Sequence, residues 1–381
     1  MHMNITLPVE NQDVLTALRS FLKQLMDAGV VNALFVPLEN GGSVVPALVT
    51  DSSILERANQ LLPVMPINSA RAVSALTGKQ VPAKLGVVLR SCEIRALVEL
   101  VKLQQAALEG VMLIGLDCPG TCELDEFLVS ETWHGENRAV SFANYLSAAQ
   151  SGSEPQLSPP LRTACRMCIH PAPENVDIHI RLFGADTTVV LPLTVKDEIA
   201  EKLQWTESAQ GEAWSMESSR KSLTSLTTGR QEFREKELAA IRGRMNADGG
   251  MIGLFTDCIR CHNCSTACPI CYCKTCLFKT TAFDHDPDYY FNAARRKGAA
   301  RLLGDTLLFH LTRLNHISAS CISCGMCTSA CPANIPVGSI FSAVGEQVQA
   351  AFEYVPGREV TESLPLITFR QNEWTEVGEE K

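Results

Sequence analysis

The chain has 381 residues, of which 46% are hydrophobic and 20% charged, a length and composition that exclude wholesale disorder and predict two or three folded domains. Its formal net charge is −9 at pH 7, which argues against nucleic acid as the main partner, because phosphate binding needs a clustered excess of Lys and Arg. With 16 cysteines in so long a chain, bound metal is a better explanation than a small disulfide scaffold.

The N-terminal sequence MHMNITLPVENQDV lacks the basic and apolar segments of a signal peptide. No stretch approaches the ~18 consecutive apolar residues that indicate a membrane span. We therefore expect reduced thiols, a cytoplasmic protein and no direct membrane span.

The first part of the chain alternates helical and strand-like patterns of apolar residues. This alternation predicts βαβ units, and hence an α/β fold with a mostly parallel sheet and helices. We expect helices over 11–29 and 93–109, strands over 31–38, 85–90, 111–117 and 187–195, and a turn at 39–43.

Residues 196–204 and 231–245 have helical composition, whereas the intervening Ser/Thr-rich segment 215–231 is predicted to be a solvated loop or linker. After Cys331 we expect a short helix within 332–355 and a solvated acidic tail that ends in EVGEEK.

Two cysteine motifs carry the strongest signal. CIRCHNCSTACP (258–269) and CISCGMCTSACP (321–332) both fit C-x2-C-x2-C-x3-C-P, the spacing of bacterial ferredoxins with two 4Fe–4S clusters. Three thiolates at such gaps can cap three irons of one cubane, while the fourth cysteine binds the other cluster. One cluster is thus expected to use Cys258, Cys261, Cys264 and Cys331, and the other Cys321, Cys324, Cys327 and Cys268.

Pro269 and Pro332 are expected to open helices, and Gly325 to let the backbone approach a cluster. Structural zinc is the alternative, but its usual two C-x2-C pairs with a long spacer fit these runs badly.

Between the motifs, 52 residues (269–320) separate Cys268 from Cys321, more than in an ordinary two-cluster ferredoxin. Residues 283–318 are predicted to be a helical insertion. Its basic cluster, Arg295, Arg296 and Lys297, is either a solvated helix face or a docking site for a partner.

Three further thiols, Cys271, Cys273 and Cys276, follow the first motif in the segment CYCKTC. They are not needed by the two clusters above. Either they bind another cluster with one more ligand, or they are buried free thiols.

A third metal site is predicted in the α/β part of the chain. Cys165 and Cys168 form a C-x2-C pair, and Cys92 and Cys118 follow two of the predicted strands. Together they can supply four thiolates, with Cys122 spare or replacing Cys118. At the same edge, Glu93 and Arg95 are expected to hold the site together or to form a surface ion pair. His170, which follows Cys168 closely, and His262, which lies within the first ferredoxin motif, are each expected to tune a cluster or to face solvent.

Here the sequence resembles the beta-subunit family of deazaflavin-reducing hydrogenases and formate dehydrogenases. The matching segments are VVLRSCEIRALVEL (87–100), LIGLDCPGTC (113–122) and CRMCIHPAPENVDIHIRLFGAD (165–186). The resemblance gives Cys92, Cys118, Cys165 and Cys168 the character of cluster ligands.

The resemblance also implies FAD, which composition does not show. Asn68, Ser69 and Ala70 lie where the family carries a flavin-contacting loop. The dinucleotide fingerprint G-x-G-x-x-G and the P-loop are both absent from the sequence.

These expectations define an α/β flavin and iron–sulfur domain over 1–245 and an α+β two-cluster ferredoxin-like domain with a helical insertion over 246–340. A helix and acidic tail complete the chain over 341–381.

The function we expect is iron–sulfur electron transfer within a cytoplasmic oxidoreductase complex of anaerobic metabolism, such as formate dehydrogenase, hydrogenase or a heterodisulfide-reductase-like assembly. Its partners would be catalytic and other iron–sulfur subunits. The alternatives are a stand-alone flavin-dependent oxidoreductase that reduces a small soluble acceptor, and a structural metal-binding module.

Overall fold

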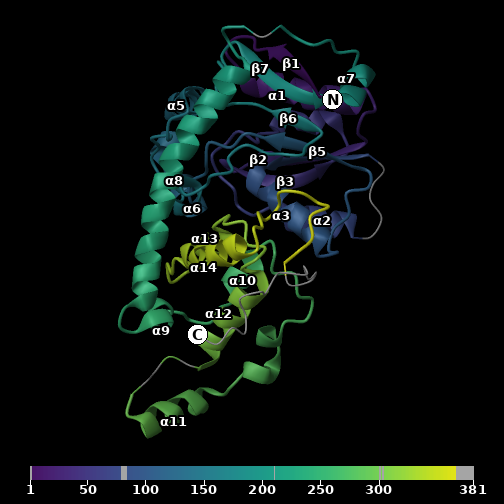
Figure 1. Cartoon of the computed structure of the whole chain (residues 1–381). Coiled ribbons are helices and arrows are strands. Elements are labelled where there is room, and N and C mark those ends of the chain that lie inside the picture. The colour runs from purple at the N-terminus through teal and green to yellow at the C-terminus, as the bar shows by residue number, and fades with distance from the viewer. Residues whose placement is uncertain (1, 79–83, 210, 300–301, 303, 366–381) are drawn as a thin grey trace. The chain divides into compact units, whose positions relative to one another are not determined.

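The computed structural model describes residues 2–78, 84–209, 211–299, 302 and 304–365 (Figure 1). The chain forms two compact units. The first comprises the residues up to Glu235 together with Gly357–Glu362, and the second comprises Lys236–Pro356 and the described residues that follow Glu362. Most of the predicted acidic tail lies outside the described residues. Among the helices of the described part, none has the length and apolar character needed to cross a membrane.

The first unit is built on a seven-stranded sheet with the order β1-β7-β6-β5-β4-β2-β3. Its central pairs, β2–β4, β4–β5 and β5–β6, are parallel, and the pairs toward both edges are antiparallel. The expected α/β class is confirmed. The parallel pairs lie in the centre of the sheet, and parallel neighbours need a crossover connection, which is usually helical. The strands are β1 (His2–Pro8), β2 (Ala33–Asn40), β3 (Ser43–Val49), β4 (Leu85–Arg90), β5 (Val111–Leu116), β6 (Ile178–Ile180) and β7 (Val190–Lys196).

Helices connect β1 to β2, β3 to β4, β4 to β5 and β5 to β6, whereas β2–β3 and β6–β7 are joined without a helix. Every residue of β4 is buried, as expected for a central parallel strand that is covered on both faces. The helices are α1 (Val14–Asp27), α2 (Ala70–Thr77), α3 (Ser91–Lys102), α4 (Leu124–Leu128), α5 (Asn137–Ser151), α6 (Thr163–Arg166) and α7 (Asp197–Lys202), with short 3-10 turns at Ser52–Arg57 and Glu131–Trp133.

The parallel pairing of β4 with β5 fixes where two of the predicted ligands lie. Arg90 at the end of β4 pairs with Leu116 at the end of β5. Cys92 and Cys118 each follow these paired residues by two positions. The register therefore brings both cysteines to the carboxyl edge of the sheet, where ligands of open α/β folds gather.

The Ser/Thr-rich segment 215–231 was expected to be a loop, and this expectation is wrong. It forms the first half of α8 (Met216–Asn246), a single long helix in Figure 1, and the boundary between the units falls inside this helix. Small side chains let its backbone approach two glycines of the first unit. Added Cβ atoms would lie 2.2 Å from Ser222 O at Gly152 and 2.4 Å from Ser218 C at Gly184.

Hydroxyl groups reinforce this close approach. Ser222 Oγ donates to Gln150 O at 2.7 Å, and Ser218 Oγ donates to Gly184 O at 3.0 Å. The polar composition thus serves a tightly packed helix face rather than a solvated loop, because small hydroxyl side chains fit where large apolar ones would not.

The second unit is helical. Within it α10 packs against α13, which packs against α14, and α12 also packs against α14. The predicted helical insertion is present as α11 and α12, and α11 stands off from α10, α13 and α14 (Figure 1). The helices are α9 (Gly250–Leu254), α10 (Asn263–Ala267), α11 (Pro287–Lys297), α12 (Gly304–Ile317), α13 (Met326–Ser329) and α14 (Val337–Ala351), with 3-10 turns at Leu277–Lys279 and Thr281–Phe283.

Gly152→Ala should destabilise the first unit by about 2–4 kcal/mol, because it combines left-handed backbone strain with a clash against the α8 backbone. Gly135→Ala is the matched control, since Gly135 also has a positive φ but has nothing within 4 Å of an added Cβ. It should cost only the strain, about 1 kcal/mol. Denaturant unfolding followed by the fluorescence of Trp133, Trp205 and Trp214 measures both, and equal losses would contradict the close approach of α8.

Candidate metal centres

The two cysteine motifs of the second unit adopt the same loop conformation. Arg260 and Ser323, which stand at equivalent positions, both have a φ of 59°. His262 and Gly325, the next equivalent pair, have φ values of 57° and 74°. These left-handed residues turn each loop so that a short helix, α10 or α13, starts immediately after it. Gly325 has the backbone freedom that the sequence predicts, whereas His262 adopts the same conformation with a side chain.

The expectation that Pro269 and Pro332 open helices is wrong. The helix α10 ends at Ala267, just before Cys268, and α13 ends at Ser329, before Cys331. Cys268 itself is extended, with φ −70° and ψ 121°. A residue before proline avoids the helical region, so Pro269 stops α10 and leaves Cys268 in extended backbone, and Pro332 likewise follows the end of α13.

Each set of four cysteines lines its own cavity in the second unit, and each set draws its fourth member from the other motif. The first cavity is lined by Cys258, Cys261, Cys264 and Cys331. The second cavity is lined by Cys268, Cys321, Cys324 and Cys327. The structure thus brings together the two sets that the ferredoxin spacing predicts.

Helix α12 of the insertion contacts sulfur in the first set. Arg313 donates from Nη1 to Cys264 Sγ at 3.0 Å and from Nη2 to Cys264 O at 3.2 Å. One turn earlier, His310 Nε2 lies 3.4 Å from Cys258 Sγ. The ring of His310 stacks on Phe255 with centroids 3.8 Å apart.

The buried charge in this unit fits a metal-bound thiolate set. Burial raises the pKa of the Cys264 thiol to about 11 and that of Cys327 well above its usual value, so neither thiol ionises at neutral pH without a metal. Arg313 is 4% exposed, and no carboxylate of the described residues forms an ion pair with it. A buried cation without a counter-charge is costly, whereas thiolates held by iron would compensate it.

The four predicted ligands of the first unit are linked by electrostatic interactions through Cys118 and Arg90. Electrostatic interactions join Cys118 to Cys165, Cys168 and Arg90, and join Arg90 to Cys92. Burial raises the pKa of the Cys118 thiol to about 11, and the Arg90 charge opposes that rise. For Arg90, burial alone would lower the pKa of the guanidinium, but the charges of Cys118 and Glu93 outweigh burial and raise it.

Arg90 is also a structural anchor for this edge of the sheet. Its Nη2 donates to Gln60 O at 3.2 Å and Leu62 O at 2.8 Å. Glu93 caps the start of α3 by accepting from Arg90 N at 2.9 Å, which explains why this helix begins earlier than the sequence pattern predicts. Arg90, which the sequence patterns did not single out, is thus an arginine that interacts with these cysteines.

Cys165 has polar surroundings. Its Sγ accepts from Thr121 N at 3.4 Å and from Arg162 Nη2 at 3.6 Å. Burial favours the neutral thiol, but the Arg162 charge and the Thr121 hydrogen bonds outweigh it and lower the pKa of Cys165. These surroundings favour the thiolate form of Cys165 relative to an ordinary thiol.

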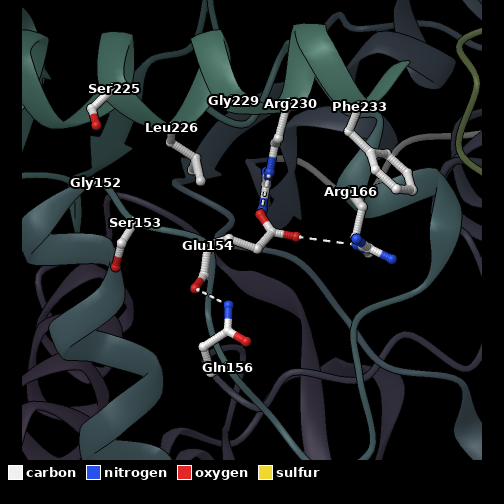
Figure 2. Close-up of a pocket in the computed structure, with 10 residues that line it drawn as sticks. All are labelled: Gly152, Ser153, Glu154, Gln156, Arg166, Ser225, Leu226, Gly229, Arg230 and Phe233. Atoms are coloured by element: carbon white, nitrogen blue, oxygen red, sulfur yellow. Dashed lines mark hydrogen bonds and ion pairs between the residues drawn. The ribbon is translucent and has the colours of Figure 1, made fainter. Parts of the chain in front are cut away.

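Beside this C-x2-C pair lies a pocket lined in part by two arginines and a glutamate (Figure 2). Arg230 Nε donates to Glu154 at 3.0 Å, and Glu154 Oε1 lies 3.9 Å from Arg166 Nε. The Arg166 guanidinium lies over the Phe233 ring at 4.0 Å. Arg230 also interacts electrostatically with Cys168 and Cys165, so a second buried cation faces these thiols.

Cys122 has different surroundings from the four predicted ligands of the first unit. It is 1% exposed within the apolar core, and its Sγ donates to Pro159 O at 3.2 Å. Burial raises the pKa of its thiol to about 12. These are the surroundings of a structural thiol.

The remaining cysteines of the second unit lie beside the second set. Cys271 interacts electrostatically with Cys268, Cys273 and Cys276. Cys273 is exposed, and Cys276 stands directly before a 3-10 turn. The described residues contain no group of three or more His, Cys, Asp or Glu side chains placed to hold a single metal ion. A 4Fe–4S cluster makes a different demand, since each thiolate binds a separate iron.

The predicted flavin residues form a buried loop next to α3. Ser69 N donates to Glu93 Oε1 at 2.9 Å, and Ala70 N donates to Asn68 Oδ1 at 3.1 Å. Asn68 is 5% exposed, and its Nδ2 finds no acceptor among the described residues. Gln60 is 2% exposed, and both polar atoms of its amide are unpaired within the same part of the chain.

The sequence analysis missed the buried arginines and His310. Arg90 ends a strand, and Arg313 and His310 lie in the insertion, 49 and 52 positions from the cysteines that they contact. One signal was available, because an Arg inside an otherwise apolar helical pattern, as in LLFHLTRL (307–314), indicates a buried charge that needs a partner.

An α/β unit followed by paired ferredoxin motifs defines an iron–sulfur protein. Residues 254–335 match the 4Fe-4S dicluster domain, so the chain carries such a domain.

Two relatives extend the similarity over nearly the whole chain. The F420-dependent formate dehydrogenase subunit beta of Methanocaldococcus jannaschii is 26% identical over 383 residues, which cover 92% of this chain and 93% of the relative. The F420-dependent formate dehydrogenase 1 subunit beta of Methanococcus maripaludis is 23% identical, with 90% of each chain covered. These relatives confirm the resemblance to the beta-subunit family.

A chain from the F420-reducing [NiFe] hydrogenase complex of Methanosarcina barkeri is a more distant structural match. It is 12% identical, with a TM-score of 0.46, and the match covers 62% of this chain and 92% of that chain.

Gly338→Ala should destabilise the second unit by about 1–3 kcal/mol, because α14 approaches the second motif too closely for a Cβ. The added atom would lie 2.8 Å from Thr328 Oγ1, which accepts from Gly338 N, and 3.3 Å from Gly325 Cα. Thermal loss of the iron–sulfur absorbance measures the effect. Gly243→Ala in α8, with nothing within 4 Å, should instead gain about 0.5–1 kcal/mol, and a similar gain at Gly338 would contradict the close packing.

Proposed function

We propose that this chain is an iron–sulfur electron-transfer subunit of an oxidoreductase complex related to formate dehydrogenases and hydrogenases. The observation that carries the proposal is the pair of cavities in the second unit, each lined by three cysteines of one motif and one of the other. The names of the two formate dehydrogenase relatives, which align over nearly their whole length, support the same function.

In this proposal the chain holds three 4Fe–4S clusters. Two are bound by the cysteine sets of the second unit. The third is bound by Cys92, Cys118, Cys165 and Cys168, of which Cys92 and Cys118 interact with Arg90, and Cys165 and Cys168 with Cys118. Cys122 is then a structural thiol, since its sulfur already donates to Pro159 O in the core.

We further propose that FAD binds beside α3, where Asn68, Ser69 and Ala70 line its site. The support is the buried amide of Asn68, whose Nδ2 has no acceptor among the described residues, since a flavin carbonyl would satisfy this donor. Gln60 is a second candidate for contact with the flavin, because both polar atoms of its buried side-chain amide are unpaired among the described residues. Its backbone oxygen accepts a hydrogen bond from Arg90, which holds the residue in place.

Together these groups would couple one-electron and two-electron chemistry, since clusters exchange single electrons and a flavin exchanges two. The residues of the chain orient these groups and set their potentials. Arg90 ties the loop at Gln60 to the edge that carries Cys92 and Cys118, so the flavin and the third cluster would share one rigid support.

The substrate reaction would belong to a catalytic partner subunit, and other iron–sulfur subunits would accept or supply electrons. We propose a cytoplasmic location, because thiols of this number persist in a reducing compartment. Cys271, Cys273 and Cys276 are candidates for a fourth cluster, whose remaining ligand would come from another chain if Cys122 stays in the core.

Anaerobically purified chain should contain about twelve iron atoms and one flavin, because three cubanes hold four irons each. Iron assay, sulfide assay and flavin fluorescence after acid release measure this. About sixteen irons would add the fourth cluster. Zinc in place of iron would overturn the proposal, and rapid reduction of a soluble acceptor by the isolated chain would favour a stand-alone enzyme.

Cys118→Ser should lose about four iron atoms, since it removes one ligand of the third cluster. Cys122→Ser keeps a donor for Pro159 O and should retain the full iron content. The two variants make the same atomic change four residues apart, so they control for each other. If Cys118→Ser retained its iron and Cys122→Ser lost it, Cys122 would be the cluster ligand and Cys118 the structural thiol.

A further inference from the structure

The inserted helix α12 places a buried cation between the two cysteine sets of the second unit. Arg313 contacts Cys264, a member of the first set, through both sulfur and carbonyl oxygen. It also lies over the ring of Phe341, which lines the cavity of the second set, and its charge interacts with Cys268 and Cys327 of that set. One guanidinium therefore acts on both sites at once.

The surroundings of Arg313 hold its guanidinium group against the sulfur of Cys264. The side chain lies over the Phe341 ring at 4.7 Å and near the Phe309 ring at 5.4 Å. Its Nε has no hydrogen-bond partner among the described residues, and none of their carboxylates pairs with it. Two aromatic faces hold the guanidinium plane, so the cation cannot turn away to solvent.

His310 extends the same helix face toward the first set alone. Its Nε2 lies 3.4 Å from Cys258 Sγ, and stacking on Phe255 fixes the ring. Residues three apart on a helix share a face, so α12 presents His310 and Arg313 together. The hydrogen bond that His310 makes with a cluster cysteine is the one to Cys258, a member of the first set.

The insertion is anchored to the first motif at a second point. Arg260, in the loop between Cys258 and Cys261, forms an ion pair with Asp305 near the start of α12. Arg260 Nη1 also donates to Tyr290 Oη of α11 at 2.8 Å. These contacts hold the start of α12 in place, and the helix also packs against α14. Arg313 is therefore held in a fixed position.

We propose that α12 is an electrostatic tuning element, in which Arg313 raises the reduction potentials of both clusters of the second unit and His310 raises that of the first. This inference rests on the proposed two-cluster function. Reduction adds one electron, and hence one negative charge, to a site already rich in thiolate. A fixed buried cation and an N–H donor to sulfur both stabilise the added charge, more strongly in a protein interior than in water.

The two roles predict distinct patterns of shifts. Loss of the Arg313 cation should lower both potentials, whereas loss of the His310 donor should lower only one. A merely structural role for α12 would instead weaken iron retention in every variant without a selective shift in potential.

The test is a redox titration of the full chain with dithionite under argon, followed by electron paramagnetic resonance. The two clusters of the second unit are recognised as the two signals that persist in Cys118→Ser. For both signals, Arg313→Met should decrease the ratio of reduced to oxidised cluster at a fixed potential at least tenfold. Tenfold equals 59 mV for a one-electron couple. Arg313→Lys keeps the cation and should restore more than half of the shift on a logarithmic scale. His310→Phe keeps the stack on Phe255 and should shift one signal only.

Arg296→Met is the matched control, because it removes one positive charge from an exposed position in the last turn of α11. It should leave both signals unmoved. Full iron with unchanged potentials in Arg313→Met and His310→Phe would overturn the inference and leave the proposed function intact. A wild-type chain without iron would overturn both. If Arg313→Met fails to hold iron, a single shifted signal in His310→Phe supports the proposal and no shift overturns it.

Discussion

Buried arginine facing cysteine sulfur is the interaction on which both candidate metal regions depend. In the first unit Arg90 is buried against Cys118 and Cys92, and Arg162 against Cys165. In the second unit Arg313 contacts Cys264. A neutral thiol compensates a buried guanidinium poorly, whereas a metal-bound thiolate compensates it well. Metal binding should therefore stabilise the folded chain, because it supplies the negative charge that the buried arginines need.

Much of the architecture could be predicted because it rests on local patterns. The strands β4 and β5 follow from short apolar runs, and their shared register places Cys92 and Cys118 at one edge of the sheet. The ferredoxin spacing likewise predicted the crossed cysteine sets that line the two cavities. In both cases the information lies within a few residues or in a fixed spacing.

What could not be predicted depends on contacts between distant segments. The first half of α8 has the composition of a loop, and its helical state depends on close packing of its backbone against Gly152 and Gly184. The role of Arg313 depends on the insertion folding back onto the first motif. Composition alone carries no information about either contact, because each partner lies 34 or more positions away.

The exchange of the fourth cysteine between the motifs has a consequence for how the protein is made. Under the proposed ligand sets, a ribosome that has delivered the first motif has supplied only three ligands of the first cluster, since Cys331 is synthesised 63 residues after Cys268. Neither cluster can be completed before the whole insertion has emerged. Cofactor loading thereby becomes a checkpoint on synthesis, because a chain truncated within the insertion would lack a full ligand set for either cluster.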